Sequence, residues 1–177
     1  ALEGDCAEIM PYLDRVDAVV TDPPYGIDYK PRDTSKEKRG GNGTSYKRAG
    51  ILNDTFAPDI GLCLEISKDQ IIWGGNYFAD QLPVKASWII WDKKGGNPAF
   101  HGKLTFADCE LAWVSDGKPA RIHQQIWSGL VRQGEEANTP RLHPTQKPAR
   151  LMDFCLKRFP NAQTILDPFM GSGTTLV

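Results

Sequence analysis

Residues 18–25, Ala-Val-Val-Thr-Asp-Pro-Pro-Tyr, decide the fold of this chain. The apolar run at 18–21 predicts a buried strand, and an acid, two prolines and an aromatic ring follow it directly. Proline donates no backbone N–H, so the carbonyls of Asp22 and Pro23 remain available as hydrogen-bond acceptors. Ligands bind at the carboxyl ends of strands in open α/β sheets, and an exocyclic amine would suit these acceptors. The alternative interpretation is that the prolines only end a strand and Tyr25 fills the core.

A second motif lies near the other end of the chain. Residues 164–166, Thr-Ile-Leu, predict another strand, and Asp-Pro-Phe-Met-Gly-Ser-Gly-Thr-Thr follows at 167–175. The glycines at 171 and 173 let a ligand approach the backbone closely, and the N-terminus of a following helix favours a negatively charged group. Taken alone, Gly-Ser-Gly is also consistent with a simple tight turn.

Together the two motifs resemble those of the amino-methyltransferases that use S-adenosylmethionine. In that family an Asp-Pro-Pro-Tyr loop holds the target base, and an Asp-Pro-Phe-x-Gly-Ser-Gly turn holds the methionine part of the cofactor. The order here, with the catalytic motif first, is similar to the β group of DNA adenine-N6 and cytosine-N4 methyltransferases, a circular permutation of the commoner arrangement. Further segments extend the resemblance over nearly the whole chain, at residues 4–6, 71–78, 87–93 and 143–148.

The resemblance implies a set of site residues. The catalytic residues would be Asp22, Pro23, Pro24 and Tyr25. Two further residues, Thr145 and Lys147, would border the methionine carboxylate of the cofactor. The complete cofactor-binding set would be Asp5, Cys6, Thr145, Lys147, Asp167, Pro168, Phe169, Gly171, Ser172, Gly173 and Thr174.

The chemistry expected at this site is the methylation of adenine N6, which is a poor nucleophile because its lone pair is delocalised into the ring. Hydrogen bonds from its two protons to the Asp22 carboxylate and the Pro23 carbonyl would favour tetrahedral geometry and stabilise the developing positive charge. The amine would attack the sulfonium methyl group in line, without a covalent enzyme intermediate or a metal. A base in a duplex must first be flipped out of its stack, and Tyr25 is expected against its face.

Three other functions are weighed against adenine methylation. A cytosine-N4 methyltransferase would present a similar amine, but such enzymes more often carry serine at the position of Asp22. A catalytically silent partner subunit usually loses the acidic or proline positions of the loop, whereas this chain keeps all four. Protein-glutamine methyltransferases usually have asparagine at the Asp22 position and the opposite motif order. The sequence therefore favours an adenine-N6 DNA methyltransferase.

Composition sets the remaining limits. With 177 residues, 40% of them hydrophobic, the chain is long enough for one globular domain over residues 1–177. Its four cysteines and three histidines lack ligand or disulfide spacing, so no metal site or disulfide framework is expected. The absence of an apolar stretch of membrane-spanning length and of a signal-peptide pattern favours a soluble protein of the bacterial or phage-infected cytoplasm. Double-stranded DNA is the expected partner, and a homodimer is compatible with the sequence.

A basic segment follows the catalytic motif. Residues 30–48 carry seven basic and two acidic side chains, a net charge of +5, although the whole chain sums to −1. The segment is rich in glycine and has neither helical nor strand periodicity, which predicts a long mobile loop. We expect it to contact DNA phosphates, the alternative being a solvated, disordered insertion. Its basic residues are Lys30, Arg32, Lys36, Lys38, Arg39, Lys47 and Arg48.

The rest of the chain reads as alternating strands and helices. Strands are predicted at residues 18–21, 70–73, 87–91, 109–114 and 164–166, and helices at 58–67 and 148–159. The stretch at 115–142 is polar and irregular, with Trp127 isolated inside it. It is either the target-recognition segment that such enzymes keep at this place or an ordinary surface excursion.

The resemblance implies a Rossmann-like α/β sheet with strand order 3-2-1-4-5-7-6, in which residues 164–166 form strand 1 and residues 18–21 form strand 4. Binding folds of this kind place an acid about 20 residues after the glycine turn, where it binds the ribose. Only four residues follow Gly173. We therefore expect strand 2 and the ribose side of the cofactor site to be missing from these 177 residues, with residues 1–5 as the remnant of strand 3.

The basic segment allows a test by salt dependence. If the side chains of Lys36, Lys38, Arg39, Lys47 and Arg48 contact phosphates, replacing each should reduce the log–log salt slope of DNA binding by about one unit. Affinity should fall about equally for all DNA sequences. Altered sequence preference with an unchanged slope would show that the segment reads bases instead.

Overall fold

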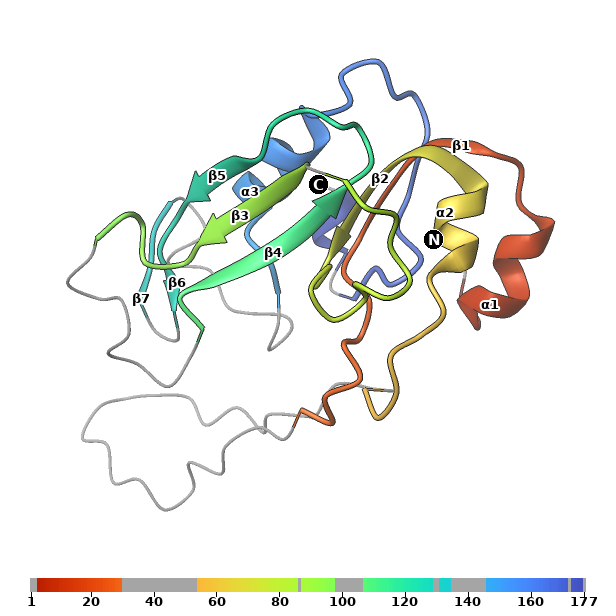
Figure 1. The fold of residues 1–177 in the computed structure, drawn as a ribbon, viewed down its shortest axis with the longest axis horizontal. Coiled ribbons are helices and arrows are strands. Elements are labelled where there is room, and N and C mark those ends of the chain that lie inside the picture. The colour runs from red at the N-terminus through yellow and green to blue at the C-terminus, as the bar shows by residue number, and fades with distance from the viewer. Residues whose placement is uncertain are drawn as a thin grey trace.

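The computed structural model describes residues 3–29, 54–85, 87–97, 107–128, 131–134, 146–171 and 173–176. These residues form a six-stranded sheet of order β5-β3-β4-β2-β1-β8 and a small sheet of β6 and β7 (Figure 1). The strands are β1 (Val16–Thr21), β2 (Ser67–Trp73), β3 (Trp88–Asp92), β4 (Cys109–Val114), β5 (Arg121–Gln124), β6 (Trp127–Ser128), β7 (Val131–Arg132) and β8 (Ile165–Leu166). The helices are α1 (Cys6–Ile9), α2 (Gly61–Ile66) and α3 (Ala149–Leu156), with 3₁₀ turns η1 (Met10–Tyr12) and η4 (Thr174–Leu176).

The strand directions identify the sheet as the mixed, Rossmann-like arrangement that the sequence predicts. Strand β1 lies parallel to both β2 and β8, whereas β4 runs antiparallel to β2 and β3. The predicted run 1-4-5-7-6 is found as β8-β1-β2-β4-β3, and β5 pairs in parallel with β3 beyond it. Strand β1, which leads into the Asp-Pro-Pro-Tyr motif, precedes the glycine-turn strand β8 along the chain, as expected for the permuted order.

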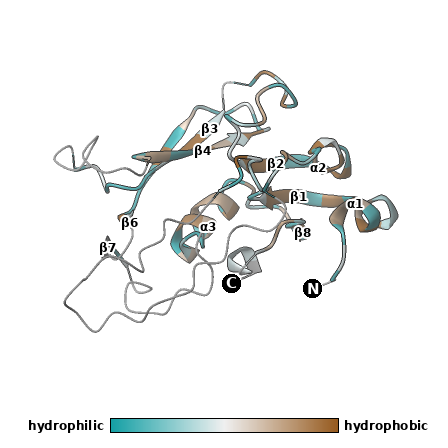
Figure 2. Ribbon diagram, turned by 90° about the horizontal axis from the view of Figure 1, so that it is seen from below, coloured by the Kyte–Doolittle hydropathy of each residue, from teal (hydrophilic) through white to brown (hydrophobic). Residues whose placement is uncertain are grey.

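Helices cover both faces of the sheet. Helix α3 packs on one face, while α1, η1 and α2 lie on the other (Figure 2). Alternate side chains of β1 point to opposite faces of the sheet, so that Val20 packs toward α3 and Val19 toward α2. This two-sided burial explains why the whole run at residues 18–21 is buried and predominantly apolar. No helix of the described residues is long and apolar enough to span a membrane.

The observed elements correct several sequence predictions. The stretch at 115–142 is not irregular throughout, because it contains β5 and the antiparallel pair of β6 and β7. Strand β5 was missed because it is a polar edge strand whose side chains are mostly exposed, with only His123 buried. Helix α2 begins at Gly61 rather than at 58, and β2 begins as early as Ser67.

The prediction that residues 1–5 are the remnant of a strand is wrong for residues 3–5. These residues are not in a strand, and Asp5 instead caps helix α1. Its carboxylate accepts a hydrogen bond of 2.8 Å from the N–H of Ala7. Such a contact satisfies one of the free donors at a helix N-terminus, which is why aspartate is favoured there.

A half-buried arginine connects α3 to the sheet. The guanidinium of Arg158 donates to Asp116 at 2.6 Å and to the buried hydroxyl of Ser87 at 3.0 Å. Ser87 also donates to Asp116 at 2.6 Å. Burial alone would raise the pKa of Asp116, but the hydrogen bonds from Arg158 and Ser87 hold it below its usual value. The three side chains thereby fix the chain after α3 to the start of β3 and the end of β4.

Removing this arginine should lower stability. Arg158→Ala should reduce the free energy of unfolding in urea by about 2–3 kcal/mol at pH 7, because it leaves a buried carboxylate without its charged donor. Since the folded state depresses the pKa of Asp116, the loss should shrink as the pH falls below about 4. Lys157→Ala is the matched control, because the Lys157–Asp153 pair is well exposed and should be worth less than about 0.5 kcal/mol. Equal effects of the two substitutions would contradict the structural role of Arg158.

Candidate active site

The two sequence motifs meet at one edge of the sheet. Strands β1 and β8 pair in parallel, with Val19 opposite Leu166. At their carboxyl ends the hydroxyl of Thr21 donates to the carboxylate of Asp167 at 2.6 Å, across 146 residues of sequence. The loops that begin at Asp22 and at Asp167 therefore leave the sheet side by side.

The Asp22 carboxylate is held by two donors. The hydroxyl of Tyr25 donates to its Oδ1 at 2.7 Å, and the ammonium of Lys147 pairs with its Oδ2. The Asp22 side chain keeps 27% of its surface exposed. A carboxylate has about four lone-pair sites, so Asp22 can accept a further hydrogen bond while it keeps both contacts.

Lys147 belongs to a chain of four charges that alternate in sign. Its side chain is only 6% exposed, and its Nζ lies 3.3 Å from Glu110 Oε2. Glu110 in turn accepts a bond of 2.8 Å from Lys93, through Oε1. The Lys147 ammonium also lies 5.1 Å from the ring centre of Trp73. We call Asp22, Lys147, Glu110 and Lys93 the charge chain.

The charge chain keeps the buried Lys147 and the partly buried Glu110 ionised. Burial alone would raise the pKa of Glu110, but the positive charges of Lys147 and Lys93 hold that pKa below its usual value. Burial alone would lower the pKa of Lys147, but the carboxylates of Asp22 and Glu110 hold it above its usual value. Both groups are therefore charged at neutral pH.

This arrangement gives Lys147 a place that the sequence did not indicate. We predicted that it borders the methionine carboxylate together with Thr145, but its ammonium contacts the carboxylates of Asp22 and Glu110. Thr145 lies outside the described residues. The indole of Trp127, far from being isolated, is buried in the core and donates to the carbonyl of Gln146 at 3.1 Å. It fixes the backbone beside Lys147.

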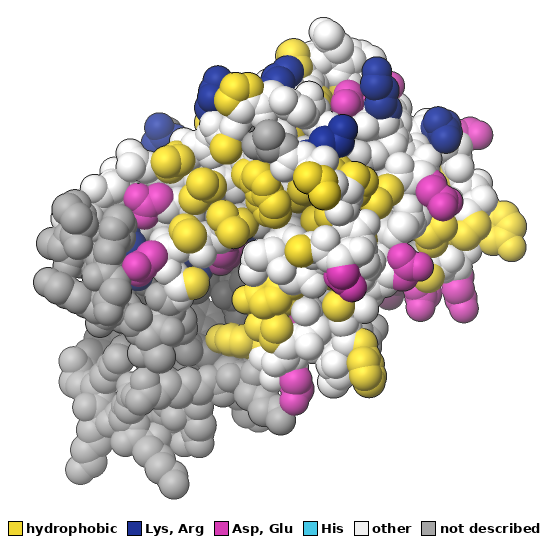
Figure 3. Space-filling view, in the orientation of Figure 1, with side chains coloured by type: hydrophobic (Ala, Val, Ile, Leu, Met, Phe, Trp, Pro, Cys, Tyr) yellow, Lys and Arg dark blue, Asp and Glu magenta, His cyan; other side chains and the backbone are white. Residues whose placement is uncertain are grey.

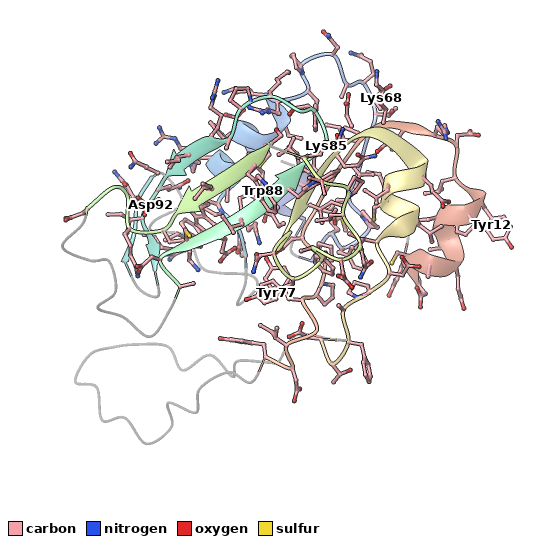
Figure 4. The ribbon with its side chains drawn as sticks, viewed as in Figure 1. Tyr12, Lys68, Tyr77, Lys85, Trp88 and Asp92 are labelled. Carbon is pink, nitrogen blue, oxygen red and sulfur yellow. The ribbon has the colours of Figure 1, made fainter. Side chains whose placement is uncertain are left out.

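Aromatic side chains position Tyr25. Its ring stacks on Tyr77 with a centroid distance of 4.7 Å and an interplanar angle of 14°, and Phe78 meets it edge-on. Figure 4 shows Tyr77 at the rim of the sheet, near the segment that follows β1. A Cβ on Gly74 would lie 2.2 Å from Cε1 of Tyr25, so this glycine is required for the ring to pack there. One face of Tyr25 is thus covered by Tyr77, which is itself 46% exposed.

The glycine turn after β8 leaves room for a ligand. Gly171 and Gly173 have φ angles of +53° and +75°, which glycine adopts without strain. No described protein atom lies within 4 Å of the position that a Cβ of Gly173 would occupy. The turn therefore suits a group that approaches the backbone closely. Ser172 lies outside the described residues.

Asp167 anchors this turn from within. Its carboxylate accepts the hydroxyls of Thr21 and Thr175, each at 2.6 Å, and the N–H of Phe169 at 3.2 Å. Burial raises the pKa of Asp167, and the nearby negative charge of Asp22 adds to this effect although the hydrogen bonds oppose it. Pro168 continues the turn, and Thr174 begins η4. On the other side, Cys6 packs against the same apolar cluster as Phe169.

The thiols near the site are poor nucleophiles. Burial raises the pKa of Cys63 and of Cys155 to about 12. Burial and the charge of Asp5 also raise the pKa of Cys6. Because the thiolate is the reactive form, these three cysteines remain protonated and unreactive at neutral pH.

The described residues on either side of the basic segment meet beside the Asp22 loop. The buried carboxylate of Asp54 accepts the N–H groups of Gly26 at 2.9 Å and of Tyr29 at 2.8 Å. The N–H of Asp28 donates to the Asp54 carbonyl at 2.6 Å. Residues 26–29 and Asp54, which flank the intervening chain, are therefore held together beside the Asp22 loop. The seven basic side chains predicted to bind DNA, from Lys30 to Arg48, lie outside the described residues.

A separate apolar hollow of about 210 Å³ opens near Trp88, Val84 and Lys85. Hydrophobic side chains gather on the same face of the molecule in Figure 3, and Figure 4 labels Trp88 and Lys85 there. Lys85 is the charged residue among those that line this hollow, and a lysine ammonium donates hydrogen bonds but does not accept them. The Asp22 loop, in contrast, offers hydrogen-bond acceptors, so we take the carboxyl ends of β1 and β8 rather than this hollow as the candidate site.

The family model of the N6/N4 DNA methylases matches residues 16–177. The chain belongs to this family. The prediction of an amino-methyltransferase from the Asp22 and Asp167 motifs is thereby confirmed at the level of the family.

Relatives show how much of a longer methylase the chain covers. The Escherichia coli (strain K12) putative methylase YubD is 27% identical over an alignment of 194 positions, gaps included, which covers 99% of this chain and 77% of YubD. The type II methyltransferase M2.DpnII of Streptococcus pneumoniae is 29% identical over an alignment of 152 positions, gaps included, which covers 80% of this chain and 53% of that enzyme. This methylase therefore corresponds to about half the length of M2.DpnII.

A solved structure shares the fold. The M1.HpyAVI-SAM complex matches with a TM-score of 0.51 and 22% identity, over 98% of this methylase and 84% of that chain. The predicted Rossmann-like methyltransferase fold is therefore confirmed.

The contact between Gly74 and Tyr25 can be tested in this methylase. Gly74→Ala should lower the free energy of unfolding by about 1–3 kcal/mol more than Gly117→Ala, because the new methyl group overlaps the Tyr25 ring. Gly117 is the matched control, since its φ of +68° resembles the +71° of Gly74 but no atom lies within 4 Å of its Cβ position. Displacement of Tyr25 should also reduce methyl transfer in Gly74→Ala alone. Equal stability and equal activity of the two variants would refute the proposed packing.

Proposed function

We propose that this methylase transfers a methyl group from S-adenosylmethionine to the N6 amine of an adenine flipped out of double-stranded DNA. The observation that carries the proposal is the position of the Asp22 carboxylate. It stands with the Pro23 carbonyl at the carboxyl end of β1, beside the glycine turn that follows β8. Acceptors for an amine and a turn open to a ligand thus share one edge of the sheet.

The protein groups would activate the amine by accepting its protons. No described residue donates a hydrogen bond to the Pro23 carbonyl, and Asp22 retains accepting capacity beyond Tyr25 and Lys147. One amine proton would go to each acceptor. These contacts strengthen as positive charge develops on the nitrogen, so they stabilise the transition state more than the ground state.

The cofactor site would be built around the turn after β8. S-adenosylmethionine, when bound, supplies an electrophilic methyl group on sulfur. Gly171 and Gly173 would allow close approach to the backbone, and Phe169 would pack beneath the cofactor. The cofactor-binding roles of Asp5, Cys6, Pro168, Ser172 and Thr174 remain sequence predictions.

The target base would enter between the catalytic loop and the basic segment. Tyr77 covers one face of Tyr25, so a flipped base would stack on the other face of Tyr25 or on the exposed part of Tyr77. Residues 30–48 would supply the positive charge that holds the phosphates, since the ends of the chain that contains them are fixed by Asp54 at this place. Residues 115–142 remain the proposed target-recognition segment.

The identity of the methylated base tests the proposal. Tritiated methyl groups should pass from S-adenosylmethionine to unmethylated genomic DNA, and nucleoside chromatography should find the label in N6-methyladenosine. Label in N4-methylcytosine would show that the target base is cytosine and not adenine. The absence of any transfer to DNA would favour a catalytically silent subunit.

Asp22 should be essential for the chemical step. Asp22→Ala should lower the single-turnover rate of methylation by about two orders of magnitude or more, because it removes a hydrogen-bond acceptor of the transition state. Asp22→Asn keeps an acceptor oxygen but removes the negative charge, so its rate should also fall, though less than that of Asp22→Ala. The exposed Asp80 provides a control, and Asp80→Ala should retain the full rate. Unchanged single-turnover methylation in both Asp22 variants would exclude the proposed role.

A further inference from the structure

We propose that Glu110 is a positioning residue for methyl transfer, which acts through Lys147 to hold the Asp22 carboxylate in place for the target amine. The inference rests on the proposed function and extends it to a residue of β4 that no sequence motif indicated. Glu110 is the second residue of β4 and lies opposite Trp91 of β3.

Glu110 joins two lysines through separate oxygens. Its Oε1 accepts from Lys93 at 2.8 Å, and its Oε2 lies 3.3 Å from the ammonium of Lys147. Lys93 directly follows β3, so its contact braces the Glu110 side chain against the neighbouring strand. Lys147, in contrast, comes from the segment before α3. Glu110 therefore ties this segment to the sheet at the level of the catalytic loop.

The position of Lys147 requires more than one carboxylate. An ammonium has three donors and is costly to bury without partners for them. The Lys147 ammonium forms ion pairs with Asp22 and Glu110 and lies near the ring of Trp73. If Glu110 were neutral, the ammonium would be drawn wholly to Asp22 and would compete with the target amine for its oxygens. Sharing the ammonium leaves Asp22 oriented and still able to accept.

The balance of charge supports the same role. Without Lys147, the negative charges of Asp22 and Glu110 would repel each other within a largely buried site. The groups that face Lys147 are the carboxylates of Asp22 and Glu110, the ring of Trp73 and the protonated thiol of Cys155. Among them, Glu110 supplies a negative charge that is free of direct contact with the proposed substrate. Its removal changes the electrostatics of Lys147 while all four residues of the catalytic loop stay intact.

The test compares Glu110→Gln with the exposed control Glu8→Gln. The single-turnover rate of methylation in Glu110→Gln should fall about tenfold or more near pH 7.5, because small displacements of reacting groups are costly. Since the Glu110 carboxylate raises the pKa of Lys147, the alkaline limb of the rate profile should move to lower pH in this variant. Affinities for DNA and S-adenosylmethionine should stay within about twofold of the unmodified protein. Glu8→Gln should match the unmodified protein throughout.

Two further variants separate positioning from packing. Glu110→Asp alters the packing more than Glu110→Gln does but keeps the charge, so it should return the alkaline limb toward its original pH. Glu110→Gln should have no further effect on the rate when it is combined with Lys147→Met, because its influence passes through Lys147. An unchanged rate and pH profile in Glu110→Gln, or additive losses in the double variant, would overturn the inference. Binding of both S-adenosylmethionine and DNA by the unmodified protein without any methyl transfer would instead count against the proposed function itself.

Discussion

The parallel pairing of β1 with β8 is the constraint on which the rest of the site depends. It brings together two loops that the chain separates by most of its length. The pairing is secured at both ends of β1. The Asp17 carboxylate accepts the N–H groups of Gln163 and Thr164, which lowers its pKa, and the Thr21 hydroxyl reaches Asp167 at the opposite end. A shift of β8 by one residue would turn its side chains to the other face and separate the loops.

Burial of Lys147 between two carboxylates is the second requirement. A buried ion pair is costly to form, and its contribution to stability is often small. We therefore interpret the charge chain as a means of orienting the Asp22 carboxylate rather than as a source of stability. It fixes an acceptor at the edge of the sheet, where the developing charge of a reacting amine is better stabilised by groups that are already in place than by water that must reorganise.

Local patterns in the sequence were sufficient to predict the strands that carry the two motifs. The apolar run of β1 and the glycine turn after β8 carry their information within a few residues, and both were placed correctly. The pairing of Lys147 with Asp22 and Glu110 depends instead on how β4 and the segment before α3 meet in space, which alternation within β4 does not reveal. Strand β5 and the buried Trp127 were missed for a related reason, because their polar surroundings resemble a surface loop.

We propose that the methyl group passes directly to the target amine, since the site positions acceptors and the three thiols of Cys6, Cys63 and Cys155 are held protonated. The stereochemistry of the transferred methyl group tests this claim most directly. S-adenosylmethionine with a methyl group made chiral by hydrogen, deuterium and tritium would be used to methylate DNA, and the configuration of the product methyl group determined. One in-line displacement predicts inversion. Retention, which requires two displacements through a methylated protein side chain, would contradict the account.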